Sequence, residues 1–445
     1  MTIGHYFPKW HERMRALPDP RNLHLITYSI SHLISLGLSM FCCQCGSRRQ
    51  LREDRQTAVF RDNLNQLSAE VGETVADPDT MNYCMERMPP QGLELYVSDT
   101  SHQLIRTRAL ERFRLDGDYL VVVDGSRLFS YTDWQHCDQC LHTTDKKSGV
   151  TTYFHSVLEA KLVSREGLAI SLASAFIENP TGDYDKQECE LRTFYEKLAP
   201  KLKKRYPRLR ICLLLDALYA NENVLRLCRQ NGWSYFIVFK KGSLPNLYAE
   251  AKRRIRQHGQ QRVIEGTTYS WAHYLQQGKE TTHAVFAQTP RQQLNGTQFG
   301  YLTDHRPSAE NTEKLVNEGG RLRWKIENEG FNTQKTGGFD LEHDYGRKGF
   351  AWKNYYFLVQ LAHMLVQLIL NTDLFGKLVS KTEDLSDLPT GARASCRSAL
   401  AYYKTLKGFA RRLTESFRMQ PLSSLGRDPD FPRQIQIRFV LMDTY

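Results

Sequence analysis

The chain has 445 residues, of which 41% are hydrophobic, and a formal net charge of +11. This length allows two or three compact units, and the hydrophobic content excludes general disorder. The basic excess favours a polyanionic partner, because lysine and arginine side chains release counterions from DNA or RNA. The ten cysteines follow no regular framework, and the start lacks the plan of a secretory signal, so free thiols and a cytoplasmic location are expected. The longest apolar segments, 23–41 and 355–370, contain too many polar residues for membrane spans and predict buried helices.

The hydrophobic pattern first predicts a helical region at 1–115, in which Asp77 caps a helix whose first turn contains Pro78. From residue 116 to 240, strands and helices follow the order β-β-β-α-β-α-β, which implies a mixed sheet flanked by helices. The later regions are a β-rich insertion at 241–305, a helical completion of the core at 306–372 and a basic helical region at 373–445. The predicted strands are 119–123, 153–162, 168–177, 211–215, 235–239, 262–265, 269–274, 282–288 and 298–303, and the predicted helices include 93–113, 185–198, 221–230 and 315–331.

Three acidic residues lie where this pattern predicts a site. Asp124 follows the apolar run 119–123, Asp216 follows the run 211–215, and Glu327 lies in a segment with a helical pattern. A carboxylate at the end of a buried strand is exposed at the edge of the sheet, where open α/β sheets place their sites. Three such groups repel one another unless cations lie between them, and Mg²⁺ and Mn²⁺ prefer oxygen ligands. Two such ions, roughly 3.5–4 Å apart, hold the attacking and leaving oxygens of a phosphodiester, so the residues predict metal-dependent cutting and joining of nucleic acid.

The segment 321–332, Arg-Leu-Arg-Trp-Lys-Ile-Glu-Asn-Glu-Gly-Phe-Asn, is the most specific stretch of the chain. It resembles the signature of the DDE transposases of bacterial insertion sequences, in the branch whose third acid lies in a Tyr-Arg-Glu-Lys motif. Val-Asp-Gly-Ser at 123–126 and Leu-Asp-Ala-Leu-Tyr at 215–219 resemble the first and second acid motifs of that family. The resemblance covers roughly residues 119–370. It implies an α/β, ribonuclease H-like core with a β-rich insertion before the third acid, between helical N- and C-terminal regions.

This resemblance implies that Asp124, Asp216 and Glu327 bind two Mg²⁺ or Mn²⁺ ions and catalyse both DNA strand cleavage and strand transfer. Arg323 and Trp324 would contact DNA beside them. The implied partner is double-stranded DNA, both the terminal repeats of the mobile element and the target. The resemblance further implies DNA binding by the region 1–115, a homodimer when DNA is bound, and association with the bacterial nucleoid.

Two positions depart from the family pattern. A tyrosine is expected three residues before Arg323, where this chain has Gly320, and a lysine is expected seven residues after Glu327, where it has Gln334. Lys335, one place later, is the candidate DNA-contacting lysine. At about 100° per residue, a regular helix would turn Lys335 away from the glutamate, unless the helix breaks between them.

Structural interpretations compete with these roles. An aspartate after a strand is often only a turn residue. Arg323 and Glu327 could form a simple i,i+4 ion pair that contributes ~0.3–0.5 kcal/mol. Trp324 is favoured as a core anchor over a base-stacking platform. Glu329 competes with Glu327, but it lies about 200° away around a regular helix, so only one of them can face the aspartates.

A separate Cys-x-x-Cys spacing, formed by Cys137 and Cys140 and followed by His142, gives a candidate structural zinc site. One such pair without a second Cys/His pair at standard spacing is a weak signal. A loop with reduced thiols is therefore the favoured interpretation.

Two other functions fit the same residues. A ribonuclease H-like nuclease would cleave DNA without joining its ends. A catalytically decayed protein would bind DNA but would no longer bind metal, and the departures at Gly320 and Gln334 support this alternative. The acid triad is complete, so a DDE transposase is the leading hypothesis.

Overall fold

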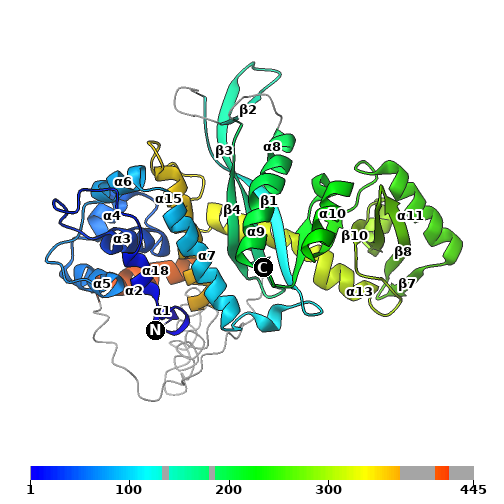
Figure 1. The fold of residues 1–445 in the computed structure, drawn as a ribbon, viewed down its shortest axis with the longest axis horizontal. Helices are drawn as coiled ribbons and strands as arrows, with labels where there is room; N and C mark the ends of the chain where they lie inside the picture. Colours follow the sequence, from blue (N-terminus) through cyan, green and yellow to red (C-terminus); the bar gives the residue numbers. More distant parts are fainter. Residues whose placement is uncertain (1, 133–139, 180–185, 371–405, 420–445) are drawn as a thin grey trace, which may run out of the picture. The chain divides into compact units, whose positions relative to one another are not determined.

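The computed structural model describes residues 2–132, 140–179, 186–370 and 406–419 (Figure 1). The chain forms two compact units, one made of residues 1–110 and 331–445 and the other of residues 111–330. Most of the predicted C-terminal region at 373–445 lies outside the described residues. Among the described helices, none has both the length and the apolar character that a membrane crossing requires.

The first unit is helical where it is described. Helices α3 and α15 pack against each other and are buried along almost their whole length. The predicted helix at 23–41 begins only at Ile30, because Ser29 caps it by accepting a hydrogen bond from the backbone of His32. The helices of this unit are α1 Thr2–Tyr6, α2 Trp10–Arg15, α3 Ile30–Cys42, α4 Arg48–Asp54, α5 Ala58–Ser68, α6 Pro78–Arg87, α7 Gln91–Arg106, α14 Thr333–Thr336, α15 Ala351–Leu370 and α18 Leu406–Met419.

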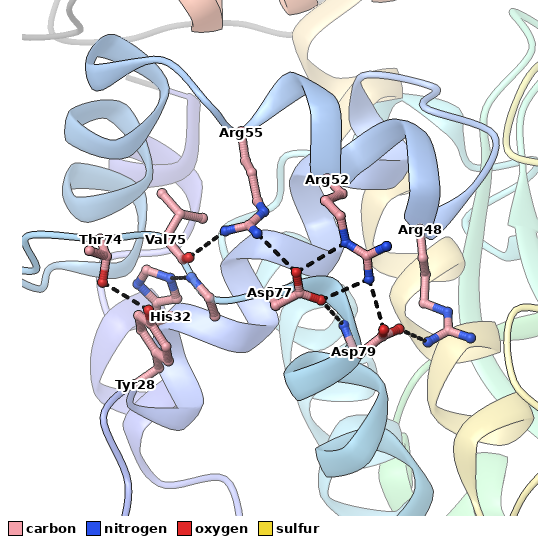
Figure 2. Close-up of polar contacts among 10 residues, drawn as sticks. Tyr28, His32, Arg48, Arg52, Arg55, Thr74, Val75, Asp77 and Asp79 are labelled. Atoms are coloured by element: carbon pink, nitrogen blue, oxygen red, sulfur yellow. Dashed lines mark hydrogen bonds and ion pairs between the residues drawn. The ribbon is translucent and has the colours of Figure 1, made fainter.

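Asp77 caps α6 and Pro78 occupies its first turn, as predicted. The Asp77 carboxylate accepts a hydrogen bond of 2.9 Å from the backbone N–H of Asp79. It also accepts hydrogen bonds from Arg52 at 3.0 Å and from Arg55 at 2.9 Å (Figure 2). These contacts connect α4 to the beginning of α6 and hold the pKa of Asp77 below its ordinary value, mainly through the hydrogen bond from Arg52.

The second unit contains a ten-stranded mixed sheet in the order β2-β3-β1-β5-β6-β10-β9-β8-β7, with β4 also paired to β3. Strand β1 is antiparallel to β3 and parallel to β5, which in turn is parallel to β6. The predicted α/β class with a mixed sheet flanked by helices is therefore confirmed. The strands are β1 Tyr119–Tyr131, β2 Leu141–Thr144, β3 Thr151–Val163, β4 Ala169–Ile177, β5 Ile211–Leu215, β6 Ser234–Val238, β7 Gln261–Ile264, β8 Thr267–Gln277, β9 Glu280–Gln288 and β10 Phe299–Thr303, and the longer helices are α8 Lys186–Thr193, α9 Ala199–Arg205, α10 Glu222–Asn231 and α11 Pro245–His258.

The predicted β-rich insertion contains its four predicted strands, β7 to β10, together with helix α11, which was not predicted. These strands do not form a separate sheet. Strand β10 pairs antiparallel with β6, with Leu302 opposite Ile237, so the inserted strands continue the core sheet. Local hydrophobic patterns locate strands but do not encode which distant strand they pair with.

The structure corrects the predicted end of the first strand. Strand β1 continues to Tyr131, so Asp124 lies within the strand and not at its end. The parallel pairing of β1 with β5 stops at Val122 and Leu214, whereas its antiparallel pairing with β3 continues through Asp124 and Glu159. The apolar run had predicted only the part of β1 that is buried on both faces.

The predicted helix at 315–331 is irregular. It consists of a π-helical turn at Leu315–Gly319, a 3₁₀ segment at Gly320–Trp324 and a π-helical segment at Ile326–Asn332. Two of its glycines, Gly319 and Gly320, pack directly on aromatic rings of the sheet. A Cβ atom on Gly319 would lie 2.7 Å from the ring of Phe236. This close backbone approach accounts for the departure from regular helical geometry.

We expect Asp77→Ala to lower the free energy of unfolding by about 1–2 kcal/mol, because the first turn of α6 loses its cap. Asp79→Ala is the matched control, since the Asp79 side chain is 66% exposed and does not cap the helix. Urea unfolding followed by circular dichroism measures both variants. Equal losses would contradict the capping role of Asp77.

Candidate active site

Asp124 and Asp216 occupy corresponding positions on neighbouring parallel strands. The last paired residues of β1 and β5 are Val122 and Leu214, and each aspartate follows two residues later. Asp216 also caps the short helix after β5, because its side chain accepts a 2.8 Å hydrogen bond from the backbone N–H of Leu218. The strand register therefore places the first two predicted acids at corresponding levels of neighbouring strands, where β5 ends and β1 continues.

Arg323 connects the third predicted acid, Glu327, to Asp124. Its Nη2 donates a 2.8 Å hydrogen bond to Glu327 Oε1, and its Nη1 lies 3.5 Å from Asp124 Oδ2. The arginine is only 8% exposed, and its Nε has no hydrogen-bond partner in the part of the chain that the structure describes. The i,i+4 ion pair is present, but it also includes an acid from the sheet.

The pKa of Asp124 reflects both its burial and the charged groups around it. Burial is the main cause that raises this pKa to about 7, and the nearby charge of Arg323 opposes the rise. Three further carboxylates, those of Glu327, Glu190 and Asp216, raise the pKa of Asp124 through their negative charge. The other two acids of the predicted triad therefore lie within electrostatic reach of Asp124, and so does a fourth acid, Glu190.

That fourth acid, Glu190 on α8, was not predicted from the sequence. Its side chain is buried, and its Oε1 accepts a 3.0 Å hydrogen bond from the hydroxyl of Tyr219. Its Oε2 lies 2.8 Å from the place that a Cβ atom on Gly125 would occupy. Helix α8 also carries Glu188, and the hydrophobic pattern gives no signal that distinguishes the two glutamates.

The structure distinguishes Glu327 from its competitor Glu329. Glu329 accepts a hydrogen bond from Lys325. Its Cγ lies 3.6 Å from the Cβ position of Gly167, in the turn between β3 and β4. Glu327 instead pairs with Arg323 and contributes to the pKa of the first aspartate. Glu327 and not Glu329 therefore interacts with Asp124, although the segment is π-helical and not the regular helix on which the spacing argument was based.

The interpretation of Trp324 as a core anchor is wrong. The side chain is 51% exposed, and the guanidinium carbon of Arg323 lies 5.0 Å from the centre of its ring. An aromatic face is therefore accessible beside the acids. The interpretation failed because it relied on the average burial of tryptophan, which does not determine the exposure of a particular residue.

The candidate lysine, Lys335, belongs to the other compact unit, where it forms a 2.7 Å ion pair with Glu342. Gln334 is fully buried and donates hydrogen bonds to Gln360 and His363. The chain before them is π-helical rather than regular or broken, so the spacing of about 100° per residue does not apply.

The donor chemistry of the site suits a hard cation, because Asp124 interacts electrostatically with three other carboxylates and only Asp124 and Glu327 pair with the Arg323 guanidinium. Within residues 2–370, apart from the two undescribed gaps, and within 406–419, no three His, Cys, Asp or Glu side chains form a ready-made metal-ligand group. The guanidinium of Arg323 lies between Asp124 and Glu327 and partly compensates their charge. Burial is the main cause of the raised pKa of Asp124, and the neighbouring carboxylates add to it; a divalent cation would neutralise their negative charge.

The zinc prediction depends on Cys137, which lies outside the described residues. Cys140 is disulfide-bonded, so the favoured interpretation of a loop with reduced thiols is wrong at this residue, and His142 is exposed on β2. A disulfide sulfur is not a thiolate ligand, so this prediction applies to the reduced chain. The predicted free thiols are found at seven other described cysteines, which are Cys42, Cys43, Cys45, Cys84, Cys189, Cys212 and Cys228.

No protein-family model matches the chain, and no curated protein sequence is similar to it.

The raised pKa of Asp124 predicts a pH-dependent stability of the metal-free chain. The folded chain keeps this proton up to about pH 7, whereas the unfolded chain releases it near the ordinary pKa of 3.8. Stability therefore falls as the pH rises through this window, by up to about 4 kcal/mol in total. In EDTA, Asp124→Asn should raise the melting temperature above that of the wild type more at pH 8 than at pH 5. An equal difference at both pH values would contradict a buried carboxyl that its neighbours repel.

Gly320 leaves no room for a side chain. A Cβ atom there would lie 2.6 Å from the nearest ring atom of Tyr301, which is itself buried. Gly320→Ala should therefore lower the free energy of unfolding by about 1–3 kcal/mol. Gly242→Ala is the matched control in the same unit, because nothing lies within 4 Å of its Cβ position. Chemical unfolding of both variants tests this, and equal stability would show that the ring moves aside.

Proposed function

We propose that the chain is a DDE transposase that cuts DNA at the ends of a mobile element and joins the freed ends to target DNA. The observation that supports this most strongly is that Arg323 pairs with both Asp124 and Glu327, while Asp216 and Glu327 act electrostatically on Asp124, in the sequence context of the family signature. The chain charge of +11 is consistent with a DNA partner.

The sheet supports a ribonuclease H-like interpretation of the core. Three antiparallel strands, β4, β3 and β1, adjoin the parallel strands β5 and β6. Helix α8 lies in the connection to β5, and α10 lies in the connection to β6. The first acid then comes from the central strand and the second from its parallel neighbour, where a topological switch point favours a site.

Asp124, Asp216 and Glu327 would hold the cations in this proposal. Bound divalent cations lower the pKa of the attacking hydroxyl group or water and neutralise the charge that develops at phosphorus. In cleavage, a water oxygen attacks phosphorus and the 3′-oxygen leaves, which frees a 3′-hydroxyl end. In joining, this hydroxyl attacks a target phosphodiester, and the 3′-oxygen of the target strand leaves. Neither displacement requires a covalent protein nucleophile.

The side chains beside the acids suit contact with a DNA strand. Arg323 has a buried donor, Nε, without a partner among the described residues, and a phosphate oxygen is a suitable acceptor. The exposed ring of Trp324 offers a face on which a base can stack. Lys335 stays a candidate for a phosphate contact, and a homodimer would hold the two element ends together.

Glu327→Gln should lower strand cleavage at least ~100-fold, because the site loses one charged ligand without a change in size. Glu329→Gln is the matched control, since this neighbour pairs with Lys325 and not with the acid group. The assay uses Mg²⁺ and a plasmid carrying the DNA that flanks this reading frame. Full activity of Glu327→Gln, or equal loss in both variants, would contradict the assigned role.

The alternative functions give different outcomes with the wild-type protein. A pre-cut DNA end should be joined to target DNA by a transposase but not by a nuclease that only hydrolyses. Calorimetry with Mn²⁺ should show binding that Asp124→Asn weakens. A decayed DNA-binding protein would show no metal binding that depends on the three acids.

A further inference from the structure

We propose that Glu190 is a fourth acidic residue of this site, where it positions Asp124 and adds negative charge that retains a divalent cation. This inference rests on the proposed function. It concerns a side chain that no sequence motif identified and that the structure places between the segments carrying the first two acids.

On one side, the Glu190 carboxylate lies against the backbone that follows Asp124. A Cβ atom on Gly125 would lie 2.8 Å from Oε2 and 3.1 Å from Cδ of Glu190. The backbone of Gly125 does not have a positive φ, so the close carboxylate, and not the conformation, is what requires glycine. The N–H of Gly125 donates a 3.0 Å hydrogen bond to Asp124 Oδ1. Glu190 therefore packs on the same peptide group that contacts the first acid.

On the other side, Tyr219 holds the Glu190 carboxylate. Its hydroxyl donates a 3.0 Å hydrogen bond to Glu190 Oε1. The Tyr219 ring is fully buried and packs edge-to-face on Phe194, with ring centres 5.1 Å apart. Tyr219 ends the short helix that Asp216 caps. The hydrogen bond thus links Glu190 to the segment of the second acid, as the Gly125 contact links it to the first.

Glu190 is 9% exposed, so water screens its charge poorly. Burial raises its pKa, and the charge of Asp216 raises it further, while the hydrogen bond from Tyr219 and the charge of Lys186 oppose the rise. Like charges buried together disfavour the folded chain unless a cation compensates them. A functional cation site explains why a carboxylate occupies this position.

A second observation indicates that a ligand completes the site. Arg323 is more than nine-tenths buried and reaches into the acid group, yet its Nε has no partner in the described part of the chain. A buried donor without an acceptor is costly. A cation with its bound phosphate or water would supply both the positive charge that the acids lack and the acceptor that Arg323 lacks.

Calorimetric titration of the full chain with Mn²⁺ tests the role of Glu190. Glu190→Gln keeps the size of the side chain and an acceptor for Tyr219 but removes the charge. We expect it to weaken Mn²⁺ binding by about 10–100-fold and to raise the metal concentration for half-maximal DNA cleavage in parallel. Tyr219→Phe, which keeps the charge but removes the hydrogen bond, should weaken binding less.

Gly125→Ala provides a second route if Glu190→Gln unfolds, because the added methyl group would displace the Glu190 carboxylate. It should shift the metal dependence in the same direction. Combined with Glu190→Gln, it should add little, since both changes remove the same contact.

Wild-type Mn²⁺ affinity and metal dependence in Glu190→Gln would overturn this inference. If Asp124→Asn still lost metal binding in that case, the proposed function would stand without a role for Glu190. If the wild-type chain bound no Mn²⁺, or bound it independently of Asp124, the proposed function would fall and this inference with it.

Discussion

Mutual repulsion of carboxylates at the edge of β1 and β5 is the constraint on which the arrangement of the second unit depends. The parallel register fixes Asp124 beside Asp216, and two glutamates from helices approach the same place. Asp124 and Glu190 are largely removed from water, so water weakly screens the interaction between their charges. The guanidinium of Arg323 compensates part of this negative charge through its ion pairs with Asp124 and Glu327. Burial, together with the charge that remains, raises the pKa of Asp124 to about 7, and this remaining charge favours a cation.

The helical side of the site depends on glycines more than on helical propensity. Gly319 and Gly320 lie so close to the rings of Phe236 and Tyr301 that no side chain fits at either position. The segment therefore packs on the sheet through its backbone, with 3₁₀ and π-helical turns in place of a regular helix. A π-helical segment then carries Glu327, and such irregular turns are common at functional sites.

Much of the sheet was predictable, because continuous apolar runs specify buried strands whatever lies around them. The same runs located Asp124 and Asp216, since each follows the last buried residue of its run. Features that arise from contacts between distant segments were not predictable. The continuation of β1, the pairing of the inserted strands with β6 and the burial of Glu190 all depend on neighbours far away in the sequence. The exposure of Trp324 is of the same kind, because a residue type sets only an average burial.

The pairing of β10 with β6 has a consequence for how the chain tolerates change. Without the segment 241–305, β6 would present unpaired backbone N–H and C=O groups along one side. An exposed edge strand of this kind can pair with strands of other molecules and cause aggregation. The inserted strands thus shield the interior of the sheet. Excising the whole segment would therefore expose the backbone of β6 to pairing with strands of other molecules.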